Sequence, residues 1–251
     1  MAACRRRSVP ALLRFGLLAL FATGVSANLE TARAAGLSLT WGSCGQLKVA
    51  NRTFACNTDA GADTLSVSFT PTFSLTKVAF AEVSMSVCFN QVASLPWWQV
   101  FDAGTCRGGA LTMAGPSPAG ACNSIWDPAA NLVQHIEPLE GGGLTTLSGA
   151  RFTPMVTLAD SALARDMVAG QEYELFRLVL RHTHTTGSSA CAGCQIGARL
   201  AADFIWVFTT TGDGQGMSTG SSATWQVPTT VCEAVVPVQR STWGALKSLY
   251  R

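Results

Sequence analysis

The residues best spaced for metal chemistry are two histidines and two cysteines. They form the pattern His-x-His-x6-Cys-x2-Cys, from His182 and His184 to Cys191 and Cys194. Two imidazoles two residues apart on a strand point the same way, and imidazole and thiolate are ligands that zinc prefers. In the competing interpretation the two cysteines are oxidised, because a disulfide removes the thiolates that zinc requires. We favour the disulfide and keep zinc as the alternative.

A second cluster carries oxygen ligands that suit calcium. Asn57, Asp59 and Asp63 surround Gly61, but the glutamate that completes a calcium loop is absent. A turn rich in Asn and Asp side chains is therefore the favoured interpretation. No Gly-x-Ser-x-Gly motif accompanies the three histidines of the chain. The sequence thus predicts no catalytic residue, and no cofactor other than zinc or calcium at these two clusters.

Adjacent tryptophans offer a binding element of another kind. Trp97 and Trp98 follow Pro96 in a segment, Trp97–Phe101, that we expect to be a strand. Neighbouring side chains of a strand face opposite ways, so one ring would lie in the core and the other would be exposed. An exposed tryptophan can stack on a sugar or fill a pocket of a partner. Trp97, Trp98 and Trp243 of the C-terminal tail are the candidate binding residues, unless a loop or the tail covers them.

The N-terminal 35 residues have the features of an export signal. Arg5, Arg6 and Arg7 precede an apolar run, and Val25-Ser26-Ala27 provides small residues for cleavage after Ala27, with a second candidate near Ala34. The alternative is an uncleaved anchor helix, for which the unbroken apolar core is short. We expect a secreted, extracellular or periplasmic protein with no membrane span after cleavage.

The charge of the chain excludes one class of partner. Residues 1–35 contain five Arg and one Glu, so the rest of the chain carries 12 basic and 14 acidic residues. A weakly acidic mature protein lacks the basic surface that nucleic acid or an anionic membrane requires. We therefore expect no nucleic-acid partner.

Without Cys4, an even number of cysteines remains after the leader, which is typical of disulfide-bonded exported proteins. The spacing favours two local pairs, Cys44 with Cys56 and Cys106 with Cys122. It further suggests Cys191 with Cys194, which leaves Cys88 with Cys232. The eight candidates are Cys44, Cys56, Cys88, Cys106, Cys122, Cys191, Cys194 and Cys232.

Period-two patterns dominate the rest of the chain and predict strands. They are clearest at Leu65–Thr70 and Val83–Phe89, while Tyr173–His182 changes phase near Leu175-Phe176, which indicates a bulge or a strand buried on both sides. The continuous apolar run Phe204–Thr209 predicts a central strand. Further candidates are Leu37–Trp41, Gln46–Ala50, Leu132–Ile136, Arg151–Leu158 and Ala223–Val227.

About ten short strands separated by turns favour an antiparallel β-sandwich, for example of jelly-roll type, over residues 36–240. Helical signals are few. Asp160 is expected to cap a short helix that runs to Val168, and Ser241 or Thr242 a second one in the tail, residues 241–251.

Two segments resemble known proteins. The run from Ala169-Gly170 through Tyr173 to Leu180 is similar to a strand entry of cohesin-type modules. The tail, Trp243-Gly244 to Lys247-Ser248-Leu249-Tyr250-Arg251, resembles the endings of secreted bacterial β-sandwich proteins that have no assigned activity. These resemblances imply export and a β-sandwich, and they imply no enzymatic activity.

Together these features predict a secreted or cell-surface module, stapled by disulfides, with a structural or binding role and no catalysis. Its partner would be another surface or extracellular protein, or a glycan. A carbohydrate- or metal-binding module is the alternative, and a secreted hydrolase is the third hypothesis.

Overall fold

The computed structural model of the protein describes residues 35–44, 49–89, 96–101, 103–117, 122–126, 132–139, 149–218 and 220–226. The predicted leader up to residue 34, Cys232, and the tail with Trp243 and its expected helix lie outside these ranges. Among the described residues, no helix has the length and apolar character needed to cross a membrane.

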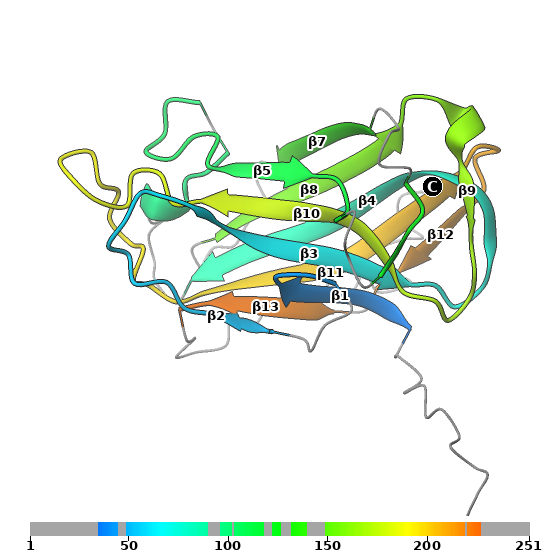
Figure 1. Cartoon of the computed structure of the whole chain (residues 1–251), viewed down its shortest axis with the longest axis horizontal. Helices are drawn as coiled ribbons and strands as arrows, with labels where there is room; N and C mark the ends of the chain where they lie inside the picture. The colour runs from blue at the N-terminus through cyan, green and yellow to red at the C-terminus, as the bar shows by residue number, and fades with distance from the viewer. Residues whose placement is uncertain are drawn as a thin grey trace, which may run out of the picture. The chain divides into compact units, whose positions relative to one another are not determined.

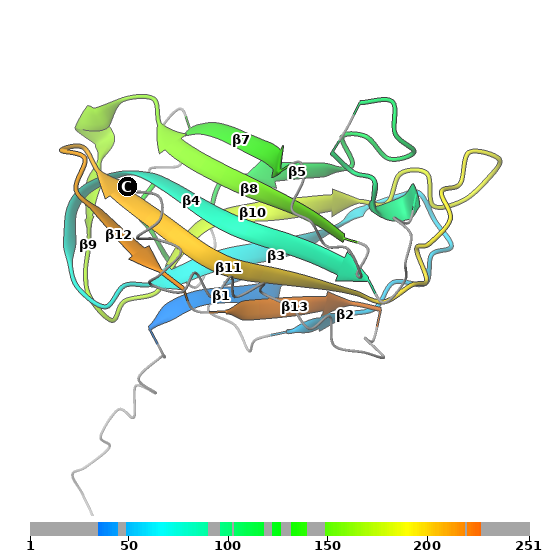
Figure 2. The ribbon, with the colours of Figure 1, turned by 180° about the vertical axis from the view of Figure 1, so that it is seen from behind.

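The described residues form two β-sheets that face each other (Figures 1 and 2). Sheet A has the order β1-β3-β10-β5, with β6 paired to β10. Its strands are β1 (Gly36–Trp41), β3 (Ala62–Thr70), β5 (Leu111–Ala114), β6 (Asn123–Ser124) and β10 (Tyr173–Arg181). The strand patterns thus correctly predicted a β-sandwich.

Sheet B is larger, with the order β2-β13-β11-β4-β8-β7, and β12 and β9 pair with β11 and β4. Its strands are β2 (Asn51–Arg52), β4 (Leu75–Phe89), β7 (Leu132–Leu139), β8 (Gly149–Leu158), β9 (Arg165–Met167), β11 (Ala198–Thr209), β12 (Gly214–Met217) and β13 (Ser221–Trp225). The predicted strand Phe204–Thr209 is part of β11, which lies inside the sheet, as expected.

Alternating apolar side chains of both sheets form the core. On β4 the buried residues are Val83, Met85, Val87 and Phe89, in the phase that the sequence predicts. On β3 they are Leu65, Val67 and Phe69. One face of each sheet is apolar because strand side chains alternate, so the two sheets bury these faces against each other.

Two of the register shifts between paired strands decide which side chains face the core. The pairing of β10 with β3 shifts between Glu174 and Phe176, which confirms the bulge predicted near Leu175-Phe176. The pairing of β11 with β4 shifts between Ala202 and Phe204. A bulge adds one residue to a strand and therefore exchanges the side chains that face the core for those that face solvent.

Two expected elements differ from the structure. The segment from Asp160 forms a 3-10 helix, η2 (Ser161–Leu163), whose Ala162 N–H donates to the Asp160 carboxylate, and β9 follows it at once. The expected strand Trp97–Phe101 does not form. Its first two residues belong to the 3-10 helix η1 (Pro96–Trp98), and the rest are not in a strand. Pro96 accounts for the turn, because proline suits a first helical position better than a strand interior.

The predicted cysteine pairs were wrong for every cysteine whose bond is described. The disulfides join Cys44 to Cys122, Cys56 to Cys194, and Cys106 to Cys191. Cys88 is also disulfide-bonded, and its predicted partner Cys232 lies outside the described residues. Short spacing misled the prediction because loops of distant strands meet at the ends of a sandwich. For example, the Trp97 N–H donates to the Ala192 carbonyl, which holds the loop of Cys191 against a segment far away in sequence.

Candidate functional site

Four aromatic side chains gather on the face of sheet B that points away from sheet A. Phe204, Trp206 and Phe208 alternate along β11, and Phe80 lies beside Phe208 on β4. We call this set the aromatic strip. Figure 2 shows the sheet from this side, with β12, β11, β4 and β8 next to one another. With 40% of its surface accessible, Trp206 is the most exposed member.

The bulge in β11 is what turns the aromatic strip outward. Before the bulge, Ala198, Leu200 and Ala202 face the core, and after it Ile205 and Val207 do. Without the extra residue, Phe204, Trp206 and Phe208 would continue the inward phase of Ala202. The local backbone therefore directs three large apolar rings to the surface.

The aromatic rings of β11 pack directly on two glycines of β12, which we call the glycine bed. Gly216 pairs with Trp206 and Gly214 pairs with Phe208. A Cβ atom built on Gly216 would lie 2.7 Å from Phe204 Cζ and 2.8 Å from Trp206 Cζ3. A Cβ on Gly214 would lie 2.6 Å from Phe208 Cδ1. The rings thus rest on bare backbone, which holds them against the sheet.

The rings form a continuous surface. Centroid separations are 5.0 Å between Phe204 and Trp206, 5.7 Å between Trp206 and Phe208, and 5.7 Å between Phe208 and Phe80. The planes of Trp206 and Phe208 are only 19° from parallel. This arrangement offers an elongated apolar platform, whose shape is fixed before any ligand binds.

Polar groups border the platform on its β4 side. Glu82 is the direct cross-strand partner of Trp206, and Ser84 is that of Phe204. Asp203, at the bulge, accepts a hydrogen bond from the Ser86 hydroxyl at 3.3 Å. An apolar surface with hydroxyl and carboxylate groups along one side is suited to bind a ligand with both CH and OH groups.

The predicted metal ligands do not form a metal site. β10 ends at Arg181, so His182 and His184 are not on a strand and do not point the same way. Instead His182 is buried, and its ring nitrogens lie 3.0 Å from the Ala60 carbonyl and 2.9 Å from Asp63 Oδ2. His184 has a left-handed backbone (φ 58°) and its ring contacts the Ser189 hydroxyl. Cys191 and Cys194 are in two different disulfides and supply no thiolate.

Of the three predicted calcium ligands, Asp59 and Asp63 are likewise occupied by protein groups. Asp63 accepts from Arg52 as well as His182. Asp59 accepts from the backbone N–H groups of Thr185 and Thr186 and from the Thr186 hydroxyl. The Thr186 N–H is the main cause that lowers the pKa of the Asp59 carboxyl from its usual value. These carboxylates thus fasten two loops together.

Trp97 and Trp98 are both buried, contrary to the expectation that one of the two rings is exposed. Trp97 is 0% and Trp98 4% exposed, because both side chains of η1 turn into the core. Trp97 lies between Trp225, at 5.0 Å, and the Arg107 guanidinium, whose Cζ is 3.6 Å from the ring centroid. Arg107 is itself buried, and burial lowers its pKa to about 10. It donates to the carbonyls of Trp97, Arg181 and Thr183.

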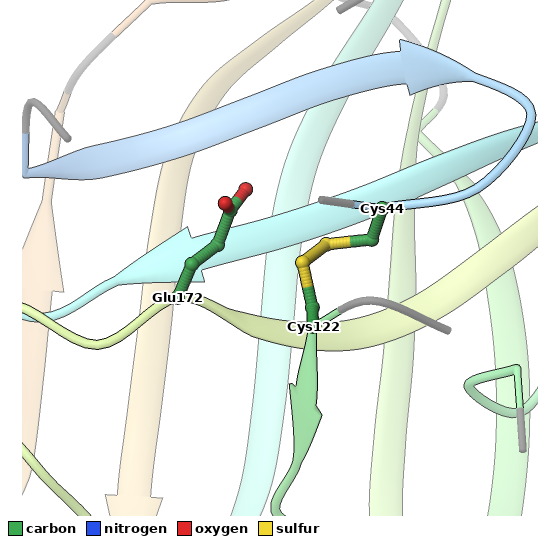
Figure 3. A group of neighbouring side chains, drawn as sticks. All are labelled: Cys44, Cys122 and Glu172. Atoms are coloured by element: carbon green, nitrogen blue, oxygen red, sulfur yellow. A yellow bond between two sulfur atoms is a disulfide. The ribbon is translucent and has the colours of Figure 1, made fainter. Parts of the chain in front are cut away.

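One cluster has ligand atoms close enough to suggest a metal, among the described part of the chain. Sγ of Cys44, Sγ of Cys122 and a Glu172 carboxylate oxygen lie within 4.8 Å of one another (Figure 3). The two sulfurs are bonded to each other, so neither is a thiolate. The Glu172 carboxylate accepts from the Ser68 hydroxyl. Cys44, Cys122 and Glu172 therefore have a structural role, as a disulfide and a hydrogen-bonded carboxylate.

Sequence reasoning missed the aromatic strip, although the chain contains its signal. The run Phe204-Ile205-Trp206-Val207-Phe208 is apolar throughout, which suggested a strand with no exposed side. Within it, however, every second residue is aromatic, and the intervening ones are aliphatic. That alternation separates the platform from the core.

Comparisons with known proteins give one weak similarity. No family model and no curated protein matches the chain. In solved structures, the chain is similar to a cohesin module from a family 33 glycoside hydrolase of Clostridium perfringens, with 9% sequence identity and a TM-score of 0.37. The match covers 76% of this chain and 98% of that module.

Proposed function

We propose that the protein is an exported, non-enzymatic module that binds polysaccharide through the aromatic strip. The observation that carries the proposal is the half-exposed Trp206 ring, set nearly parallel to Phe208 on a bed of glycines. The faces of pyranose rings carry CH groups, which stack on aromatic rings, and their edges carry hydroxyls, which hydrogen-bond to groups such as Glu82.

The size of the platform favours a glycan over a protein partner. An aromatic side chain has roughly 150–250 Å² of surface, and all four rings are partly buried, so the aromatic strip offers on the order of 250 Å². A stable protein interface needs about 800 Å² from each partner. A polysaccharide chain that contacts a few rings along β11 needs far less, because its remaining surface stays in water.

Export and the absence of catalysis are parts of the same proposal. Seven described cysteines are disulfide-bonded, which is typical of proteins from oxidising compartments, and the leader-like N-terminus supports the same location. The one His–Asp pair of the described chain that resembles a catalytic dyad is closed to substrate. Both ring nitrogens of His182 face protein acceptors, and Phe54 stacks on the ring at 3.8 Å.

The test is retention on polysaccharides with matched variants. The full chain, expressed with its leader, is run in gels that contain soluble polysaccharides and is mixed with insoluble cellulose and chitin. We expect at least one polysaccharide to retain the protein, and Trp206→Ala to weaken this binding about tenfold or more, or roughly 1.4 kcal/mol.

Phe73→Ala is the matched control. Phe73 is 50% exposed, lies between β3 and β4, and is not a member of the aromatic strip. It should leave retention unchanged. Absence of retention on all polysaccharides, or equal loss in both variants, would contradict the proposal.

A further inference from the structure

The side chains around the aromatic strip carry a charge pattern that bears on which polysaccharide it accepts. Glu82 lies directly across from Trp206, and Asp203 immediately precedes Phe204. The arginines of this face lie farther along the strands. Arg151 is opposite Ser86 and Arg199 is opposite Cys88, which places both beyond Ser84 at the other end of the sheet.

We infer that the aromatic strip selects neutral polysaccharides and rejects acidic ones, and that Glu82 is the residue that makes this distinction. The inference rests on the proposed function. Directly paired residues of neighbouring antiparallel strands have Cβ atoms only about 5 Å apart. A sugar stacked on Trp206 therefore has its edge next to the Glu82 carboxylate.

A neutral sugar and a uronate interact with Glu82 in opposite ways. Hydroxyl groups donate to the carboxylate, and hydrogen bonds to an ionised acceptor are the stronger kind. A uronate or sulfate group at the same place brings a second negative charge within several ångströms. Because this contact is at the surface, we expect repulsion to weaken binding about tenfold at low salt. Salt screens exposed charges, so the preference should shrink as ionic strength rises.

Two cationic residues lie beyond the Phe80 end of the aromatic strip, because Lys77 precedes Val78 on β4 and Arg165 of β9 pairs with Val78. Met155 of β8 pairs with Glu82 on one side and with His135 of β7 on the other, so one strand separates His135 from Glu82. Asp213, next to Gly214, adds another carboxylate, which accepts from the Thr211 hydroxyl. Of the two residues paired directly with Trp206, Gly216 has no side chain, and Glu82 therefore supplies the charge next to this ring.

The experiment is affinity electrophoresis of the full chain at low and high salt. The neutral probes are hydroxyethyl cellulose, galactomannan and arabinoxylan, and the acidic probes are carboxymethyl cellulose, polygalacturonate and alginate. We expect retention by at least one neutral probe, and about tenfold weaker retention by the acidic ones. In Glu82→Gln the ratio of retention by neutral probes to retention by acidic probes should fall to about threefold or less, and this ratio should no longer depend on salt.

A matched control and the contrary outcomes separate the two proposals. Asp160→Asn removes a carboxylate that caps η2, distant in sequence from the aromatic strip, and should leave the ratio unchanged. Equal or tighter retention by acidic probes, lost in Trp206→Ala, would overturn the selectivity and keep the proposed function. An unchanged ratio in Glu82→Gln would overturn the role of Glu82. No retention by any probe would overturn both proposals.

Discussion

At the scale of single residues, polar side chains join the loops of the protein to one another. Arg107 is 1% exposed, yet its guanidinium satisfies three carbonyl groups and covers the Trp97 ring. Asp63 bridges His182 and Arg52 in the same way, and Asp59 holds the Thr185–Thr186 backbone. Residues that looked like ligands in the sequence are therefore the supports of the loops.

Replacement of Arg107 by methionine tests this role. It leaves the carbonyls of Trp97, Arg181 and Thr183 without their donor in a buried place, at a cost of about 1 kcal/mol each. We expect the free energy of unfolding, measured by chemical denaturation, to fall by about 3 kcal/mol in Arg107→Met.

Arg151→Met is the control for that measurement, because Arg151 is an exposed strand residue, and its effect should stay within about 0.5 kcal/mol. Lysine keeps the charge at position 107 but lacks the planar fork, so Arg107→Lys should lose most of the same stability. Wild-type stability in both Arg107 variants would show that the carbonyls find other partners.

At the scale of elements, the bulge of β11 and the glycines of β12 act together. The bulge turns Phe204, Trp206 and Phe208 outward. Gly214 and Gly216 have no side chain, so the rings can pack against the backbone of β12. The rings in turn cover strand glycines that have no side chain of their own to shield the backbone. A hairpin of two strands thus builds all of the platform except Phe80 of β4.

Gly216→Ala tests whether the glycine bed matters for binding. The new methyl group would lie within 3 Å of ring atoms of Phe204 and Trp206, so these rings must move off the sheet. We expect polysaccharide retention to fall several-fold. Gly220→Ala is the matched control, because a Cβ there has no neighbour within 4 Å. Unchanged retention in Gly216→Ala would show that the flat ring arrangement is not needed.

Strands with regular alternation could be predicted from the sequence, and strands without it could not. β3, β4 and β8 carry an apolar residue at every second position, and the phase change in β10 revealed its bulge. By contrast β12 reads Gly-Gln-Gly-Met, which has the composition of a loop. Its pairing with β11 makes it a strand, although its own residues carry no apolar alternation.

The candidate site was harder to predict for a related reason. The tryptophans Trp97 and Trp98 were expected to form a strand, but Pro96 starts a turn that buries both. The exposed Trp206 lies in a run whose total hydrophobicity suggested burial. Exposure of an aromatic ring depends on the phase of its strand, and the bulge that sets this phase is defined only by pairing with β4.

At the scale of the whole molecule, disulfides bind loops of different strands into one unit. The three described bonds span 78, 138 and 85 residues. In the chain-entropy model, loops of this length stabilise a fold by about 4.5 to 5 kcal/mol each. Covalent links of this span therefore oppose unfolding of the sandwich as a whole.

Mass mapping without reduction tests this network. Proteolysis of the oxidised protein should release linked peptides that contain Cys44 with Cys122, Cys56 with Cys194, and Cys106 with Cys191. After reduction and alkylation, the midpoint of thermal unfolding should fall by more than about 10 °C, because several kcal/mol are lost in a domain of this size. A peptide that links Cys44 to Cys56 would contradict the arrangement.

The pattern of these bonds also constrains how the protein matures. After its leader, a chain that is exported from its N-terminus would present Cys44 first and Cys56 next. No described disulfide joins these two cysteines, and none joins any other two successive cysteines. An oxidase that coupled thiols in their order of arrival would trap the chain in wrong partnerships. Productive maturation therefore requires either that oxidation waits until Cys194 has emerged, or that an isomerase reshuffles the early bonds.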